Sequence, residues 1–226
     1  TFQNATKGCK NLIIGTRNAL CFTGTDNPQN NVFLGHYVAQ GMSGNLNHNV
    51  LIGGCTSRNG NPSSGVIIGT NAGFGVLGQT HQSNVIIGNS AGYSISTGSY
   101  NVLLGSSAGQ CVCCGINNVY LGLQAAQKQS RGGCNVAIGC GALFGDQNNV
   151  YPLHNVVALG VHAGYSASTA NHSIFIGSSA GCKVTTGTSN IAMGNGALKC
   201  TTTGNGNIAL KGGICITTGN DNVVLG

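Results

Sequence analysis

The chain has 226 residues, of which 39 are Gly and only 5% are charged, and its formal net charge is +6. Soluble globular domains contain about 25% charged residues, so this composition excludes an ordinary globular domain. Hydrophobic residues make up 41% of the chain and Pro occurs only 3 times, which excludes both a disordered chain and a collagen triple helix.

A five-residue pattern, Asn-Val-x-Ile/Leu-Gly, recurs along the whole chain. Successive copies are offset by 15 to 21 residues, most often by 17. Three apolar and largely β-branched residues before a Gly predict a short strand followed by a corner, and a fixed period of this length is typical of a solenoid. The copies span residues 11–15, 31–35, 49–53, 65–69, 84–88, 101–105, 118–122, 135–139, 156–160, 173–177, 190–194, 207–211 and 222–226.

These copies predict a single all-β domain over residues 1–226, a parallel β-solenoid (β-roll) of about 13 coils with a 17-residue period. After the strand, many coils continue with two small or polar residues and Ala-Gly, as at 106–109 and 178–181, which we expect to be a second extended piece. Gly suits corners with positive φ, and stacked Asn side chains can bond from coil to coil, so both columns are predicted to be structural.

The middle residue of each predicted strand points to the opposite face from its two neighbours. All three positions are apolar, which predicts that both faces are buried. One coil is too thin to supply two interiors, so the middle column is predicted to be an oligomer interface covered by a partner chain. This predicted interface consists of Ile13, Phe33, Leu51, Ile67, Ile86, Leu103, Tyr120, Ala137, Ala158, Phe175, Ala192, Ala209 and Val224.

The 11 Cys residues indicate an oxidising environment, and several of them recur about one coil apart. Stacked coils bring such residues close enough for disulfides between coils, and an odd Cys is left for another chain. The candidates are Cys9 with Cys21, Cys114 with Cys134, and the series Cys182, Cys200 and Cys215.

An alternative for some of these Cys residues is a structural metal site. Cys111, Cys113 and Cys114, with Cys134 and Cys140, supply thiols but lack paired Cys-x-x-Cys spacings, so we predict no metal. The 3 Asp lie beside Asn or Gly in predicted turns and no Glu occurs, which disfavours a hydrolytic carboxylate pair. The His residues fall in connecting segments, where we expect them to be solvated. The sequence therefore predicts neither an enzyme nor a cofactor.

Basic residues are scattered, and no apolar run reaches the roughly 18 residues of a membrane helix, so neither nucleic-acid binding nor membrane insertion is predicted.

Aromatic residues recur at the fifth position after the corner Gly, at Phe74, Tyr93, Phe144 and Tyr165. These side chains either cover the corner of the coil or bind a glycan or a host protein.

Two stretches of the repeat, residues 84–92 and 101–109, read Asn-Val-Ile-Ile-Gly-Asn-Ser-Ala-Gly and Asn-Val-Leu-Leu-Gly-Ser-Ser-Ala-Gly, and residues 190–197 follow the same pattern. They resemble the head repeats of YadA-type trimeric autotransporter adhesins and, more closely, the repeats of virus and phage fibre proteins. The resemblance covers nearly the whole chain. It implies a parallel β-roll that packs as a trimer, is displayed on a surface and often contacts a host.

The expected function is that of a structural subunit of an extracellular, cell-surface or virion-surface fibre. Such a subunit is expected to be stabilised by disulfides, to form a homo-oligomer and to assemble head to tail into a filament. The alternative is an adhesive or receptor-binding head. In that case the insertions at 25–30 and 146–155 are the expected contact loops for a host glycan or protein.

Overall fold

The computed structural model describes residues 10–18, 27–42, 46–145, 152–211 and 216–225. These residues form short strands joined by tight turns, and none of them is helical. The protein is an all-β, parallel β-solenoid of about 11 turns with a period of about 17 residues. The predicted fold class is therefore confirmed. The chain divides into two compact units, Thr1–Gly115 and Ile116–Gly226.

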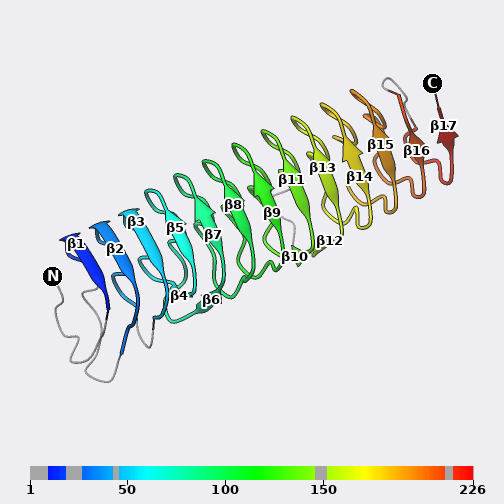
Figure 1. Ribbon diagram of the computed structural model, residues 1–226. Coiled ribbons are helices and arrows are strands. Elements are labelled where there is room, and N and C mark those ends of the chain that lie inside the picture. Colours follow the sequence, from blue (N-terminus) through cyan, green and yellow to red (C-terminus); the bar gives the residue numbers. More distant parts are fainter. Residues whose placement is uncertain (1–9, 19–26, 43–45, 146–151, 212–215, 226) are drawn as a thin grey trace. The chain divides into compact units, whose positions relative to one another are not determined.

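In the described part of the first unit, one strand from each coil pairs in parallel with the strand of the next coil (Figure 1). A second, smaller ladder pairs β4 (Asn61–Ser63) with β6 (Thr80–Gln82). The strands of the main ladder are β1 (Leu12–Thr16), β2 (Val32–His36), β3 (Val50–Gly54), β5 (Val66–Ile68), β7 (Val85–Ile87) and β8 (Val102–Leu104).

The second unit repeats this arrangement in its described residues. Its small ladder pairs β10 (Gly132–Gly133) with β12 (Leu153–His154). The strands of its main ladder are β9 (Val119–Leu121), β11 (Val136–Ile138), β13 (Val157–Leu159), β14 (Ile174–Ile176), β15 (Ile191–Met193), β16 (Ile208–Ala209) and β17 (Val223–Val224).

The register of both main ladders follows the sequence repeat. Leu51 pairs with Ile67, and Ala137 pairs with Ala158, so each column of the repeat becomes a row of neighbouring residues in space. Every predicted strand segment overlaps one strand of a main ladder. The repeat read from the sequence is therefore the structural repeat.

The corner Gly residues allow successive coils to approach closely. Gly160 has a φ of 134°, and a Cβ atom at this position would lie 2.7 Å from the carbonyl carbon and oxygen of Gly177. A side chain would therefore collide with the backbone of the next coil. This contact explains why the column is Gly in nearly every copy.

The interior of each coil lies between the middle residue of the strand and the Ala that follows the corner. Ile86 and Ala91 are both fully buried. Across the coil, Gly92 is so close to the strand that a Cβ atom there would lie 3.1 Å from Ile86 Cδ1 and from Leu103 Cδ1. Small residues on one side thus leave room for large side chains on the other.

This packing corrects the predicted oligomer interface. The middle column points into the coil of its own chain, because Ala and Gly opposite the strand make room for it, and it cannot contact a partner. Its fully buried members are Phe33, Leu51, Ile67, Ile86, Leu103, Tyr120, Ala137, Ala158, Phe175, Ala192 and Ala209. Ile13 and Val224, nearer the ends of the described ladders, are half-buried.

The Ala-containing segments are also not extended as predicted. Residues 106–111 and 178–183 form turns. Within the first of them, the backbone N–H of Ala108 donates to the carbonyl of Gly105 at 3.2 Å, and Ser107 has a left-handed φ of 57°. A tight turn is required here because Ala has to point back toward the strand.

Candidate functional site

The most extensive candidate site is formed by the outward side chains of the main ladders. In each unit, the residues on either side of the middle column form two parallel rows of Val, Ile, Leu and Met, which we call the aliphatic face. In the first unit these residues are Leu12, Ile14, Val32, Leu34, Val50, Ile52, Val66, Ile68, Val85, Ile87, Val102 and Leu104. In the second they are Val119, Leu121, Val136, Ile138, Val157, Leu159, Ile174, Ile176, Ile191, Met193, Ile208, Leu210, Val223 and Leu225.

Every residue of the aliphatic face is half-buried or exposed, and none is charged. Neighbouring strands lie about 4.8 Å apart, so each side chain touches the same position of the next coil and the rows are continuous. Six or seven strands at this spacing present an apolar area on the order of 300 Å² in each unit. The largest apolar patch of a typical monomer reaches about this size and is often functional, which makes this face a candidate interaction site.

The Asn residues that precede the strands form a buried ladder, as the repeat predicted. Asn49 donates from its backbone N–H and from Nδ2 to Oδ1 of Asn31, at 2.9 and 3.1 Å. Its Nδ2 also donates to the carbonyl of Pro62 at 3.0 Å. Each side-chain amide therefore forms hydrogen bonds both to the preceding coil and to a turn of its own coil, which is a structural role.

The aromatic residues stack from coil to coil. Phe74 and Tyr93 have ring centroids 4.9 Å apart, and Phe144 and Tyr165 have centroids 4.8 Å apart with an interplanar angle of only 7°. These distances match the spacing of coils. Cations extend both stacks: the Arg58 guanidinium lies 6.0 Å from the centroid of Phe74, and Lys128 Nζ lies 4.8 Å from that of Phe144.

The cysteine predictions have different outcomes. Cys134 is exposed and is a free thiol, so the predicted pairing of Cys134 with Cys114 is not formed. In the series Cys182, Cys200 and Cys215, Cys182 is half-buried and is a free thiol. The Cys182 thiol instead lies 3.8 Å from the carbonyl of Lys199, to which it donates. Cys200 is not a free thiol. The remaining candidates, Cys9, Cys21 and Cys215, lie outside the described residues.

Within the described residues, no three side chains of His, Cys, Asp or Glu gather in a way that could hold a metal ion. No helix of the described chain is long and apolar enough to cross a bilayer. Of the insertions predicted as contact loops, residues 25–26 and 146–151 lie outside the described residues, whereas 27–30 and 152–155 are described.

One His was misplaced by the sequence interpretation. His36, His48, His154, His162 and His172 are exposed as expected, whereas His81 is only 1% exposed. Its Nδ1 lies 3.2 Å from Asn84 Nδ2, which donates to it, and its Nε2 has no hydrogen-bond partner among the described residues. Burial lowers the pKa of His81 from 6.5 to about 4.

The signal for this burial was present in the sequence. His81 lies three residues before the ladder Asn84, and the same position in other coils holds Leu46, Pro62 and Leu153, all buried. The column is therefore an interior one, and a His placed in it has to be neutral.

Comparison of the chain with protein-family models, with curated proteins and with solved structures finds no match. The function has to be argued from the geometry of the chain itself.

Proposed function

We propose that the chain is a non-enzymatic structural subunit of an extracellular or virion-surface fibre, in which copies of the chain associate through the aliphatic face. The observation that supports this proposal is that face, where two apolar rows continue through consecutive coils without a charged residue. An exposed surface of this kind is unfavourable in water and is stabilised by burial.

The occupant proposed for the aliphatic face is a second copy of the same chain. Every coil presents the same class of side chain at the same spacing, so the rows of one copy match those of another over their whole length. The chain also has few charges to oppose self-association, with only 5% charged residues. A three-fold arrangement is part of the proposal and comes from the resemblance to trimeric fibre repeats.

Durability is the second argument for a fibre. In each unit the described coils are held by backbone ladders and by the Asn side chains described above, and these bonds repeat with every coil. Regular hydrogen bonding of this kind suits a long, stiff element better than a mobile catalytic site. Covalent bonds between chains and head-to-tail assembly into filaments remain further parts of the proposal.

Sedimentation velocity at micromolar concentration tests the assembly. The wild-type chain is expected to sediment as a discrete oligomer, and Ile87→Lys is expected to shift it to monomer, because a charge would have to be buried in the interface. Thr97→Lys is the matched control, since Thr97 is exposed outside the aliphatic face. Circular dichroism checks that the variants remain folded.

A wild-type chain that stays monomeric at this concentration would contradict the proposal. So would an Ile87→Lys variant that is folded and keeps the wild-type oligomer. Electron microscopy of the same samples tests the further step, in which the oligomers associate into filaments.

A further inference from the structure

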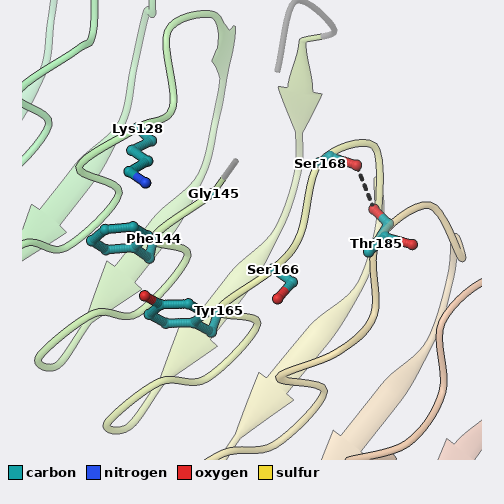
Figure 2. A pocket seen from close by; sticks show the side chains of 7 residues that line it. All are labelled: Lys128, Phe144, Gly145, Tyr165, Ser166, Ser168 and Thr185. Atoms are coloured by element: carbon teal, nitrogen blue, oxygen red, sulfur yellow. Dashed lines mark hydrogen bonds between the residues drawn. The ribbon is translucent and has the colours of Figure 1, made fainter. Parts of the chain in front are cut away.

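The stacked pair Phe144–Tyr165 is bordered by two hollows of the surface, both within the second unit. The first has a volume of about 310 Å³ and is shown in Figure 2. The Lys128 side chain points toward the Phe144 ring, and hydroxyl side chains lie on the other side of Tyr165 (Figure 2). The residues that matter for its chemistry are Lys128, Phe144, Tyr165, Ser166, Ser168 and Thr185.

The second hollow has a volume of about 360 Å³ and shares Tyr165 and Ser166 with the first. This second hollow extends to the coil that follows Tyr165 in the chain. The residues that line it are His162, Tyr165, Ser166, Ser179, Cys182 and Lys183. We call the two neighbouring hollows together the Tyr165 groove, and each is of the size at which small-molecule sites begin, about 300 Å³.

The groove exists because the aromatic stack ends at Tyr165. One face of its ring packs against Phe144 at 4.8 Å. The same position of the next coil, the fifth after the corner Gly, is Cys182, whose side chain is much smaller than a ring. The second hollow is lined by both Tyr165 and Cys182, so it lies where a third stacked ring would otherwise be.

The described charged side chains that line the groove are both cationic. Lys128 lies at the first hollow and Lys183 at the second, and among the residues that the structure describes no acidic side chain lines either hollow. Lys183 is exposed, so its ammonium group is available to a ligand. A ligand with a carboxylate would meet an attractive charge at either hollow.

The polar groups of the groove are hydroxyls. Ser168 Oγ donates to the carbonyl of Thr185 at 3.0 Å, and Thr185 Oγ1 donates to the carbonyl of Thr202 at 3.1 Å, which orients both oxygens. Their lone pairs can accept from a ligand hydroxyl. An aromatic ring beside several hydroxyls matches a pyranose, which has one apolar C–H face and a polar rim.

We propose that the Tyr165 groove binds an acidic saccharide. A sugar ring lies against Tyr165 above Cys182, its hydroxyls bond to Ser166 and neighbouring hydroxyls, and its carboxylate pairs with Lys183. The Phe74–Tyr93 stack of the first unit serves as the internal comparison, because it has the same ring geometry with centroids 4.9 Å apart. The groove would give a fibre subunit a recognition function, and it does not depend on the assembly proposed above.

Titration of the full chain, observed by NMR of its backbone amides, tests the inference with two matched ligands. Methyl β-glucuronide and methyl β-glucoside share a ring and differ by the carboxylate. The glucuronide is expected to shift resonances of Tyr165, Ser166 and Lys183 and to bind at least about threefold more tightly, since the added contact is a partly exposed ion pair.

Variants separate the contributions of the ring and the charge. Tyr165→Ala is expected to weaken glucuronide binding by about tenfold, and Lys183→Met to make the two sugars bind equally. Tyr93→Ala removes a ring from the other stack and should leave glucuronide binding unchanged. Tyr165→Phe keeps the ring and should retain most of the affinity, which distinguishes a contact with the ligand from a loss of folding.

Three outcomes would overturn the inference. The first is that neither sugar shifts these resonances at tens of millimolar. The second is that sodium acetate shifts them as strongly as the glucuronide, which would mean that only an anion is bound. The third is unchanged binding to folded Tyr165→Ala. Sedimentation of the same samples reports the oligomer separately, and the titration repeated on Ile87→Lys shows whether binding survives without assembly.

Discussion

Oδ1 of Asn84 accepts two hydrogen bonds from Asn101, one coil later: one from the backbone N–H at 2.8 Å and one from Nδ2 at 3.1 Å. The same Nδ2 donates to the carbonyl of Gly115 at 2.7 Å. Both Asn residues are buried, so no water can replace these bonds when one side chain is lost. The Asn column is thus a chain of linked amides inside the coil wall.

Replacing Asn101 with Ala should therefore destabilise the fold strongly. The substitution removes the side-chain bonds to Asn84 and Gly115 and leaves the carbonyl of Gly115 without this donor, which should lower the free energy of unfolding by about 3 kcal/mol. Urea denaturation followed by circular dichroism measures the loss.

The control for Asn101→Ala is Asn205→Ala, on an exposed ladder. Asn205 Oδ1 accepts from Thr188 N at 2.8 Å and from Thr188 Oγ1 at 3.1 Å, but water can take its place. Its loss should cost no more than about 1 kcal/mol. Equal costs for the two variants would show that burial of the Asn ladder contributes nothing.

Corner glycines should tolerate no side chain. Gly160→Ala would place a methyl group 2.7 Å from the Gly177 backbone, and the coils cannot separate without breaking their ladder. We expect a loss of about 4 kcal/mol or more, seen as insoluble protein or as a much lower melting temperature.

The matched variant is Gly196→Ala in the same unit. Gly196 has a φ of 66°, and a methyl group added to it would have Lys199 Cδ as its nearest neighbour, at 3.8 Å. Ser107 and Ser179 adopt the same left-handed conformation at the equivalent position of other coils. The cost should be only about 1 kcal/mol. If both Gly variants melt alike, the steric account of the corner column is wrong.

The sequence predicted the parts of the coil in which a residue type has a single structural role, namely the corners and the strand starts. Gly at the corners and Asn before the strands indicate a coil whatever surrounds them, so the strands and their register followed directly. Which side chains of a strand point into the coil did not follow, because Val85, Ile86 and Ile87 are all apolar and hydropathy cannot distinguish the inner face from the outer one. The size of Ala91 and Gly92 across the coil decides it.

The candidate sites were less predictable because they depend on neighbouring coils. His81 is buried by the column it shares with Leu46 and Pro62, not by its own sequence neighbours. The Tyr165 groove exists because Cys182 is small where another ring would fit. In both cases, the environment of a residue is set by residues one coil away, and it emerges only after the columns are aligned in three dimensions.

His81 makes the stability of the first unit depend on pH. Its pKa is about 4 in the folded chain and 6.5 when solvated, so below pH 6.5 the unfolded chain binds a proton that the folded chain does not. Stability is full above pH 6.5 and falls by about 3 kcal/mol as the pH is lowered to 4. Melting temperatures measured across this range should show the fall.

His81→Leu should remove most of that pH dependence, since Leu is accepted in this column at Leu46 and Leu153 and does not titrate. His172→Gln is the control at an exposed position and should keep the wild-type profile. A wild-type melting temperature that is flat between pH 6.5 and 4, or a His81→Leu profile identical to that of wild type, would disprove the assignment.

Cys134 should form a disulfide between chains if copies associate through the aliphatic face. Its thiol is free and exposed, and it lies two residues before Val136, which belongs to that face, so a partner covering the face brings another chain beside it. Covalent dimers are expected on non-reducing gels of the oxidised wild type, and they should be lost in Cys134→Ser.

The Cys134→Ser substitution is geometrically neutral, because Ser64, Ser83 and Ser189 adopt the same left-handed conformation at this position of other coils. Cys182→Ser should keep the dimers, since Cys182 lies outside the aliphatic face; dimers that persist in Cys134→Ser and vanish in Cys182→Ser would place the contact between chains on another face.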